Sequence, residues 1–510
     1  MNKIIIDGNS LTLEDIINVS RNFYEVEIDE SSVEKIEYSR CIIEDIVKSE
    51  KVVYGVNTGF GSLANVKVSK EDTKQLQENL IRSHAAGFGN ALDTDIVRAT
   101  MLIRVNSLIK GFSGIRKVVV DTLIEMLNKK VHPIIPEKGS LGASGDLAPL
   151  SHMVLPMLGL GEAEYKGEIL EGLIAMQDAN ITCIELSSKE GLALINGTTV
   201  LTAIGAMALY DSINLAKFSD AISAITLESN QGIIDAFDHR LHEIRPHRGQ
   251  IKTAENIRKL TEGSTLLSHQ GQIRVQDPYS LRCIPQVHGS TKDALYFIKE
   301  KVELEINAVT DNPIVTLEGD VISGGNFHGE PMAMIFDYMA IALSEIANIS
   351  ERRMERLINA SLSGKPSFLV SHPGLNSGFM IAQYAAASLV SENKILSHPA
   401  SVDSIPSSEN QEDIVSMGTI AARKAYDISK NVRRVLATEL MAACQSLELK
   451  EDYKLGKGSN YLFKEFRRSV KFIEYDREIQ MYQELDKATE FLFNIEILEN
   501  IEKLIDSELF

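Results

Sequence analysis

Residues 331–357 read PMAMIFDYMAIALSEIANISERRMERL, and this stretch decides the class of fold. Its apolar side chains recur at steps of three, four and five residues, at Ile335, Met339, Leu343, Ile346, Ile349, Met354 and Leu357. Such a period places these side chains on one face of a helix, and Pro331 suits the first turn, where a missing N–H costs nothing. The stretch therefore predicts a long helix with one buried face.

Helical patterning dominates the second part of the chain and is weaker before it. Residues 382–396 and 419–447 carry similar apolar stripes, and residues 450–510 are more charged but still helical in pattern. Residues 1–195 hold many glycines and prolines in turn-like clusters, which indicates short helices, loops and little sheet. We expect a mainly α protein with a loop-rich N-terminal domain over 1–195 and a helical bundle with a helical tail over 196–510. Several faces are more apolar than a monomer needs, so oligomerisation is expected.

Composition bounds the class of protein. The chain has 510 residues, 44% hydrophobic and 24% charged, which is ordinary for a globular protein and rules out wholesale disorder or a fibrous repeat. Its 71 acidic and 52 basic residues give a formal charge of −19, which repels phosphate backbones and argues against nucleic acid as a partner unless a local basic patch exists. Four widely spaced cysteines provide neither a CxxC pair nor a disulfide framework, so we expect a reducing compartment and a cytoplasmic protein.

Two apolar segments bear on targeting and membrane association. The start, MNKIIIDG, has three consecutive apolar residues before a charge and a turn, which predicts a short strand at residues 4–6 rather than a signal peptide. Residues 191–210 carry no charge and have the length of a membrane span, but they include Asn196, Gly197 and Thr198. We expect a buried helix of a large soluble core there, and no membrane association.

The most unusual local string is GSLGASGDLAP at residues 139–149. A serine nucleophile elbow needs G-x-S-x-G, but GASGD at 142–146 lacks the last glycine, and Pro133 and Pro136 argue against a preceding central strand. A phosphate-binding P-loop needs a lysine followed by serine or threonine, which the string lacks. Taken alone, the string is most simply interpreted as a glycine-rich turn.

Ala143-Ser144-Gly145 within this string resembles the self-processing tripeptide of the aromatic amino acid ammonia-lyases. In that family the glycine nitrogen attacks the alanine carbonyl and two waters are lost, which gives the electrophile 4-methylidene-imidazol-5-one (MIO). The residue types suit this chemistry, because a β-carbon at Gly145 would crowd the ring, Ser144 carries a hydroxyl to eliminate, and Ala143 is a small acyl partner. The resemblance implies that Asp146 assists maturation and that neither an external cofactor nor a metal is used.

Seven further strings follow in the order seen in this family and span about 360 residues. They are YGVNTGFG at 54–61, SHAAG at 83–87, NGT at 196–198, QDPYSLRC at 276–283, TDNP at 310–313, GGNFHG at 324–329 and QED at 411–413. Each string is weak alone, but the ordered set is most similar to the histidine ammonia-lyases. The resemblance implies a mainly α fold of the fumarase/aspartase-like superfamily and a homotetramer in which neighbouring chains share each site.

The resemblance also assigns roles to the groups that meet the substrate. Tyr54 is expected to be the base that removes a β-proton, which requires a pKa below the ordinary tyrosine value of about 10. Arg282 is expected to bind the substrate carboxylate, because a planar guanidinium donates to two oxygens at once. His84 and Glu412 are expected to orient an imidazole ring, whose nitrogens donate or accept hydrogen bonds.

Four more residues complete the expected site. Asn196 and Tyr279 are expected to donate hydrogen bonds to the MIO carbonyl as negative charge develops there. Phe327 is expected to pack on the ring system, and Gln276 to help bind the substrate. The activity implied by this set is the non-oxidative deamination of L-histidine to trans-urocanate and ammonia, a step of histidine degradation.

The prediction of histidine as the substrate depends on a few positions. Ala85 after His84, and Glu412 after Gln411, favour histidine over tyrosine or phenylalanine. Histidine ammonia-lyases usually carry a second histidine two residues after the glutamate, where this chain has Ile414, an aliphatic residue more typical of the tyrosine-type relatives. A tyrosine or phenylalanine ammonia-lyase, a 2,3-aminomutase with the same electrophile, and a helical scaffold that binds an amino acid without turnover therefore stay open as alternatives.

Two charged motifs lie outside the resemblance. The string DHRLHE at 238–243 lacks the H-E-x-x-H spacing of a zinc site, so a solvated helix face or loop is expected there. Arg352, Arg353 and Arg356 form a basic stripe, which we interpret as surface or interface charge that pairs with Glu351 and Glu355.

Overall fold

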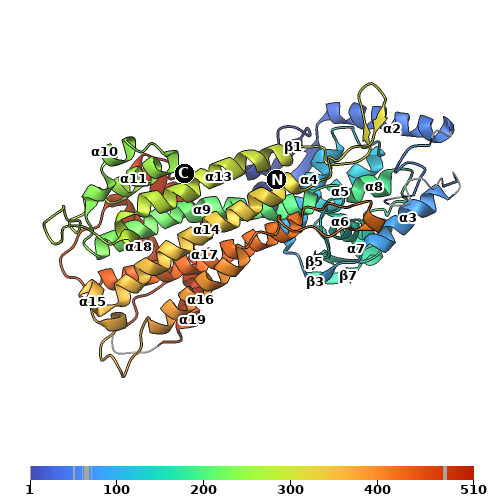
Figure 1. Ribbon diagram of the computed structural model, residues 1–510. Helices are drawn as coiled ribbons and strands as arrows, with labels where there is room; N and C mark the ends of the chain where they lie inside the picture. The colour runs from blue at the N-terminus through green and yellow to red at the C-terminus, as the bar shows by residue number, and fades with distance from the viewer. Residues whose placement is uncertain (1, 50–51, 60, 62–67, 70–71, 475–478) are drawn as a thin grey trace. The chain divides into compact units, whose positions relative to one another are not determined.

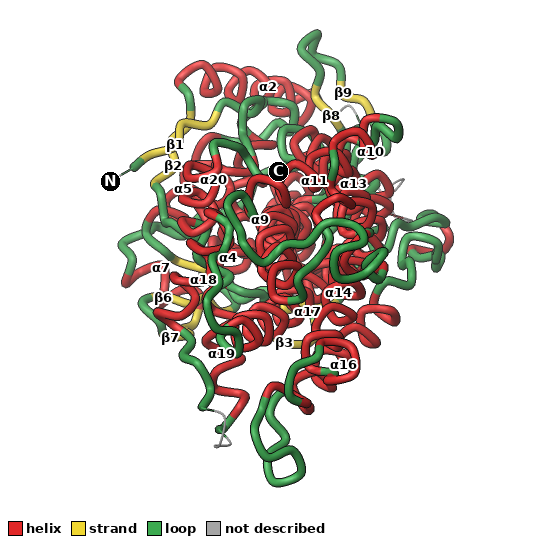
Figure 2. Tube along the Cα trace, turned by 90° about the vertical axis from the view of Figure 1, so that its left-hand side faces the viewer, coloured by secondary structure: helices red, strands yellow, loops and turns green. Residues whose placement is uncertain are grey.

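The computed structural model describes residues 2–49, 52–59, 61, 68–69, 72–474 and 479–510. Helices dominate these residues and the strands are short (Figures 1 and 2), so the mainly α fold is confirmed. The chain forms two compact units. The first unit comprises Met1–Ala208, Lys299–Asp337 and Pro399–Arg423, and the second comprises Leu209–Ile298, Tyr338–His398 and Lys424–Phe510. Each unit draws on separate stretches of the chain, and the division at residue 195 stays a prediction.

The first unit contains short helices joined by loops. Its helices are α1 (Leu13–Ser20), α2 (Glu30–Ser49), α3 (Thr73–His84), α4 (Thr94–Leu108), α5 (Lys117–Asn128), α6 (Leu147–Val154), α7 (Gly172–Asp178) and α8 (Glu190–Ile195), with 3₁₀ turns η2 (Leu155–Leu158) and η5 (Ser408–Asn410). The start of α1 shows how local sequence sets a boundary. The Thr12 hydroxyl accepts from the Asp15 N–H while the Asp15 carboxylate accepts from the Thr12 N–H, a reciprocal capping box.

The first unit contains four small sheets among the described residues. β1 (Lys3–Ile6) pairs in parallel with β2 (Glu25–Ile28), which confirms the strand expected at residues 4–6. The other pairings are antiparallel: β3 (Phe88–Ala91) with β5 (Pro136–Lys138), β4 (Val131–Pro133) with β6 (Glu162–Tyr165) and β6 with β7 (Glu168–Glu171), and β8 (Ile314–Val315) with β9 (Val321–Ile322). Pro133 and Pro136 therefore lie in short strands before the 139–149 string.

Four long helices contribute residues to both units: α9 (Thr199–Ser229), α13 (Ile284–Glu305), α14 (Glu330–Ile358) and α17 (Gly418–Leu447). α14 confirms the helix predicted from residues 331–357. Pro331 occupies its first turn, and all seven apolar residues of the predicted stripe are buried. Burial of these side chains, at about 1.5–3 kcal/mol each, is the main reason that this segment is a helix in the protein.

The second unit continues these long helices and adds shorter ones: α10 (His239–Glu243), α11 (Arg248–Leu260), α12 (Tyr279–Arg282), α15 (Ala360–Ser363), α16 (Met380–Leu396), α18 (Lys457–Ser469), α19 (Met481–Phe491) and α20 (Glu496–Ile505), with η3 (Ile234–Phe237) and η4 (Ser367–Leu369). The helices expected at 382–396, at 419–447 and in the tail are present as α16, α17 and α18 to α20. His242 of α10 is buried, and its imidazole meets the Ala236 carbonyl and the Gln250 amide.

The interpretation of the basic stripe on α14 as surface charge was wrong for its central member. Arg353 is fully buried and pairs with Glu439 of α17 (Nε–Oε1 2.6 Å), which also accepts from Thr226 and Ser350. A buried charge needs such a partner, since leaving it unpaired in the core is costly. Arg352 follows the expected pattern, with an ion pair to Glu351, and the charge of Glu355 acts on Arg356.

The charge-free stretch at 191–210 is interior to the protein. α8 and α9 cover it, Asn196 to Thr198 separate the two helices, and every residue of the stretch is buried. By length and composition alone, α9 and α14 have windows apolar enough for a membrane span, but 89% and 67% of those windows lie buried inside the structure. This burial is typical of core helices and explains the apolar composition without a bilayer.

Candidate active site

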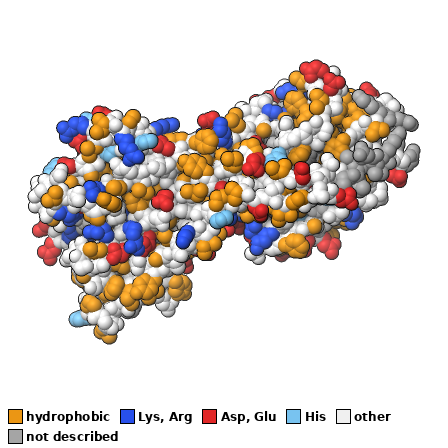
Figure 3. Space-filling view, in the orientation of Figure 1, with side chains coloured by type: hydrophobic (Ala, Val, Ile, Leu, Met, Phe, Trp, Pro, Cys, Tyr) orange, Lys and Arg blue, Asp and Glu red, His pale blue; other side chains and the backbone are white. Residues whose placement is uncertain are grey.

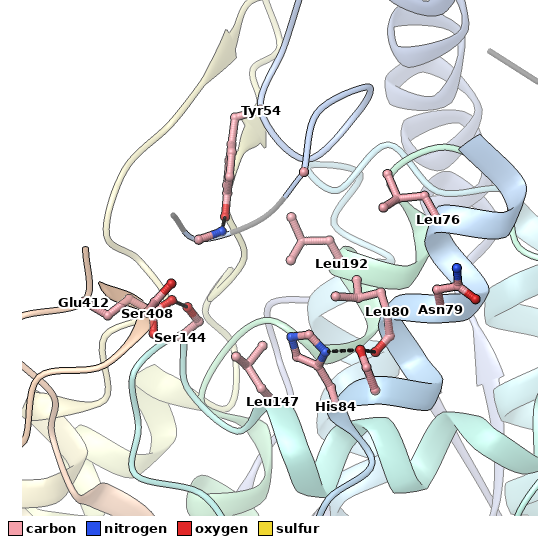
Figure 4. Close-up of a pocket in the computed structure, with 13 residues that line it drawn as sticks. Tyr54, Leu76, Asn79, Leu80, His84, Ser144, Leu147, Leu192, Ser408 and Glu412 are labelled. Atoms are coloured by element: carbon pink, nitrogen blue, oxygen red, sulfur yellow. Dashed lines mark hydrogen bonds between the residues drawn. The ribbon is translucent and has the colours of Figure 1, made fainter. Parts of the chain in front are cut away.

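Two cavities of the first unit meet around Ser144. They measure about 510 and 500 Å³, and both are lined by Tyr54, Gly61, Ser144, Leu192 and Glu412. Figure 4 shows Ser144 beside Ser408 and Glu412 on one side, with His84 and residues of α3 on the other and Tyr54 reaching in from its own loop. The structure thus brings together predicted residues from six separate stretches of sequence: Tyr54, His84, Ser144, Asn196, Phe327 and Glu412.

The tripeptide lies in a tight turn just before α6. Gly145 has φ +77°, and a β-carbon on it would lie 2.0 Å from the Gly197 carbonyl oxygen. Gly197 explains this closeness, since its N–H donates to the Ser144 carbonyl (3.0 Å) and its carbonyl accepts from the Asp146 N–H (2.7 Å). Only a residue without a side chain fits at position 145 in this left-handed, crowded backbone. The glycine that the chemistry needs is therefore also the one that the fold needs.

Asp146 anchors the turn from inside the protein. It is fully buried, and its carboxylate accepts from the Thr419 hydroxyl (2.6 Å), the Ser140 hydroxyl (3.2 Å) and the Leu201 N–H (2.8 Å). Burial raises the pKa of Asp146 above its ordinary value, although these hydrogen bonds oppose the shift. A buried carboxyl with an elevated pKa, next to the tripeptide, is suited to proton transfer.

Asn196 is buried beside the tripeptide, and residues 311 and 312 hold its side chain by hydrogen bonds. Its amide nitrogen donates to the Asn312 carbonyl (2.9 Å) and to Asp311 Oδ1 (3.3 Å), while its side-chain oxygen is buried without a hydrogen-bond partner. Asp311 in turn pairs with Lys189 (2.6 Å), and both are fully buried. Burial lowers the pKa of Lys189, and the charge of Asp311 opposes this. Because both amide N–H groups are used in this way, the donor role expected for Asn196 stays a prediction.

Tyr54 is the expected base, and its environment shifts its pKa upward. Its hydroxyl accepts from the Gly61 N–H at a long 3.5 Å. Burial raises the pKa of Tyr54, the negative charges of Glu412 and Asp311 raise it further, and the Gly61 hydrogen bond lowers it. The direction is opposite to the lowering that a tyrosine base requires, so a positive charge from outside this cavity is needed for that role. Phe60 of the same loop lies outside the described residues.

His84 is the last residue of α3. Its Nδ1 lies 3.0 Å from the Ser83 hydroxyl, the contact drawn in Figure 4. Burial lowers the pKa of His84, while the Leu80 carbonyl and the charge of Glu412 raise it. The imidazole is therefore mainly neutral near pH 7, with one nitrogen to donate and one to accept.

Glu412 follows a strained turn. Ser408, Glu409 and Asn410 all have φ between +51° and +66°, a region that side chains rarely adopt. The turn directs the Glu412 carboxylate into the cavity, where it accepts from the Ser407 hydroxyl (3.0 Å) and, weakly, from the Ser144 hydroxyl (3.5 Å). A carboxylate and a neutral imidazole thus line one cavity together.

Three of the expected site residues belong to the second unit. Tyr279 begins α12 and Arg282 ends it, with the guanidinium 4.7 Å from the centre of the Tyr279 ring. Gln276 precedes them and is exposed, and Tyr279 is 71% exposed. Exposure of a tyrosine and a glutamine in this way leaves them available to another surface. Their place in the site stays a prediction.

The structure adds residues that the sequence did not single out. Thr419, Ser140 and Ser407 hold the two carboxylates of the site, and Lys189 neutralises Asp311 beneath Asn196. None has a local signal, because each is distant in sequence from the group that it contacts or is a common polar residue. Among the described residues, no three His, Cys, Asp or Glu side chains gather as a metal site would require.

The substrate-related departure at Ile414 lies at the edge of this region. Its side chain is 65% exposed and lines neither cavity, and its carbonyl accepts from His328 Nε2 (3.3 Å). An imidazole is therefore present near this position, although it comes from another part of the chain.

Comparison with known proteins identifies the family to which the chain belongs. The sequence matches the family described as "Aromatic amino acid lyase" over residues 11–468. The chain therefore belongs to the aromatic amino acid lyase family and is a carbon–nitrogen lyase. It is 65% identical over 508 residues to the histidine ammonia-lyase of Clostridium tetani, which covers 99% of both chains.

Solved structures agree with this membership. Histidine ammonia-lyase from Trypanosoma cruzi has a TM-score of 0.92 and 38% identity, covering 98% of this chain and 95% of that one. Tyrosine aminomutase from Streptomyces globisporus has a TM-score of 0.95 and 36% identity, covering all of both chains. The fold is thus shared by a histidine ammonia-lyase and a tyrosine aminomutase, so the side chains around the cavity have to distinguish the two activities.

Proposed function

We propose that the protein catalyses the non-oxidative deamination of L-histidine to trans-urocanate and ammonia. The observation that carries the proposal is the cavity in which His84 and Glu412 accompany Tyr54 and Ser144. The high identity to the histidine ammonia-lyase of Clostridium tetani supports the same substrate. An imidazole needs hydrogen-bonding partners on its two nitrogens, and a carboxylate with a neutral histidine supplies an acceptor and a group of either kind.

The MIO group fits the residues that would form and hold it. Gly145 lies in a cradle that a β-carbon would fill, and Asn196 and Phe327 line the cavity beside Ser144. We assign Ala143, Ser144 and Gly145 as its source, Asp146 as the acid that assists maturation, and Asn196, Tyr279 and Phe327 as the residues that would hold it. When formed, the group supplies an electrophile for the substrate amine.

The chain's own residues then bind the substrate and move one proton. Arg282 binds the carboxylate through two parallel hydrogen bonds, and Gln276 assists. His84 and Glu412 fix the imidazole, which turns the β-carbon toward Tyr54. The Tyr54 phenolate removes the β-proton as the amine leaves.

Tyr54 needs help for this role, because burial and Glu412 raise its pKa. A cation within about 4–6 Å of its oxygen lowers a pKa by 1–3 units. Arg282 is a candidate for that charge, and in our proposal it comes from a neighbouring chain of a homotetramer. Each site would then combine Tyr54 and Glu412 of one chain with Arg282 of another, in a cytoplasmic enzyme.

A second candidate is a tyrosine or phenylalanine ammonia-lyase, or a 2,3-aminomutase, with the same electrophile. Ile414 and the structural similarity to tyrosine aminomutase favour it. In that case the cavity would hold a phenyl ring, which has no donor for the carboxylate, or a phenol ring, whose hydroxyl can donate a single hydrogen bond to it.

A substrate panel tests the proposal. The purified protein is incubated separately with histidine, tyrosine and phenylalanine, while ultraviolet absorbance reports the conjugated acid and a separate assay reports β-amino acid. We expect urocanate and ammonia from histidine alone. Turnover of tyrosine or phenylalanine in preference to histidine, or formation of a β-amino acid, would overturn the assignment.

A further inference from the structure

The second unit contains a cavity, distinct from those around Ser144, whose charged lining is entirely basic. It measures about 520 Å³, and its lining includes Arg274, Arg356, Lys365 and Lys450 but no acidic side chain among the described residues. We call it the basic cavity. On the face in Figure 3, by contrast, acidic and basic side chains are interspersed.

Of these four cations, Arg274 alone has a carboxylate partner among the residues that the structure describes. It forms an ion pair with the buried Asp277, and it donates to the carbonyls of Asn230 (2.9 Å) and Gln231 (3.2 Å). These contacts within the chain are sufficient to hold the Arg274 guanidinium in place.

Lys365 is held by neutral oxygens. Its ammonium donates to the Ser229 carbonyl (2.9 Å) and hydroxyl (2.6 Å) and to the Ser446 hydroxyl. In the described part of the chain, neither the Arg356 guanidinium nor the Lys450 ammonium has an ion-pair partner within 4.0 Å. Three cations thus share one cavity without a counter-charge in contact.

This arrangement is costly for the protein by itself. Burial lowers the pKa of Lys365 to about 7, and the charge of Lys450 adds to the effect. Burial also lowers the pKa of Lys450, and the charge of Arg274 adds to this effect. Burial lowers the pKa of Arg356 as well, where the charge of Arg274 adds to the effect and those of Glu355 and Asp277 oppose it. Like charges held together in a partly dry cavity repel one another, and a bound anion would remove that cost.

We propose that the basic cavity binds the phosphate group of a small molecule. Phosphate has enough oxygens to accept from the Arg356 guanidinium fork and the Lys450 ammonium at the same time. The three N–H groups of Lys365 are already used by Ser229 and Ser446, so Lys365 contributes its charge. Gly364, beside Lys365, has open space within 4 Å of where its β-carbon would lie, so a ligand has room to approach. The volume lies within the range of small-molecule sites and exceeds the size of phosphate alone.

Isothermal titration calorimetry of the full-length protein tests the proposal with two probes, inorganic phosphate and glycerol 3-phosphate, at constant chloride. We expect saturable binding of one probe molecule per chain. Tighter binding of glycerol 3-phosphate assigns the site to a phosphate ester, and equal or weaker binding assigns it to inorganic phosphate. An absence of saturable heat with both probes overturns the proposal.

Variants assign the binding to the basic cavity. Arg356→Gln and Lys450→Gln remove cations that make no ion pair, so both should fold normally, and each should weaken binding at least about tenfold. The matched control is Arg352→Gln, on the same helix but exposed and paired with Glu351, which should bind as the unmodified protein does. Unchanged affinity in both cavity variants, with normal thermal unfolding, would place any bound phosphate elsewhere and refute the assignment.

Discussion

Replacing Gly145 by alanine tests the link between the fold of the turn and its chemistry. The new β-carbon would lie 2.0 Å from the oxygen and 2.3 Å from the carbon of the Gly197 carbonyl, both backbone atoms that cannot rotate away. The Gly197 and Asp146 hydrogen bonds that close the turn would have to lengthen. We expect the variant to be destabilised and to keep its unprocessed backbone.

The size of the effect follows from two separable costs. A left-handed conformation costs a residue with a β-carbon about 1–2 kcal/mol. Overpacking against fixed atoms costs about 1–3 kcal/mol more. The free energy of unfolding should therefore fall by about 2–5 kcal/mol, measured by urea denaturation with circular dichroism.

Two other glycines of the first unit separate these costs. Gly167 has φ +86° with no atom within 4 Å of its would-be β-carbon, so Gly167→Ala should cost only about 1–2 kcal/mol. Gly324 has open space and no left-handed φ, so Gly324→Ala should change stability by less than about 0.5 kcal/mol. If Gly145→Ala proved no worse than Gly167→Ala, the crowding argument for the turn would be refuted.

Three further predictions concern the cavity. Ser144→Ala loses only a weak 3.5 Å hydrogen bond, so the free energy of unfolding should change by less than about 0.5 kcal/mol. Turnover, measured in a stopped assay, should fall at least ~10³-fold. A stable variant that retains turnover would contradict this prediction. Glu412→Gln keeps the shape but removes the charge, and the preference in kcat/KM for histidine over tyrosine should fall about 10–100-fold, whereas an unchanged ratio would show that the carboxylate does not select the ring. Because the pKa of His84 is lower in the folded protein than the ordinary 6.5, the unfolded chain binds the proton first, and the contribution of His84 to stability should fall as the pH drops below about 6.5. His84→Asn should remove this part of the dependence of the unfolding temperature on pH. An identical pH dependence in the variant would mean that the buried imidazole is not its source.

The fold was predictable where one segment carries its own signal. α14 follows from its apolar stripe and the proline in its first turn, because the period of 3.6 residues is local information. The composition of the two units was not predictable in the same way. Lys299–Asp337 and Pro399–Arg423 join the first unit through contacts with residues far away in the sequence, and no local pattern encodes them.

The candidate site likewise combines residues with a local sequence signal and residues whose roles depend on long-range contacts. The Ala143-Ser144-Gly145 string could be singled out because its residue types are the ones that the proposed ring closure requires. The group that holds Asp146 is Thr419, 273 residues later, and Arg353 meets Glu439 across 86 residues, so a residue's burial and partner stay hidden in the sequence. The upward pKa shift of Tyr54 likewise depends on Glu412, which only folding places beside it.

The central claim is that the chain converts residues 143–145 into its own electrophile. Intact-mass spectrometry of the purified protein, on the same preparation that is assayed with histidine, tests it most directly. We predict an active preparation whose mass is below the encoded value by two water molecules, with the loss confined to the peptide that contains Ser144 and absent in Ser144→Ala. An active preparation at the full encoded mass would contradict the claim.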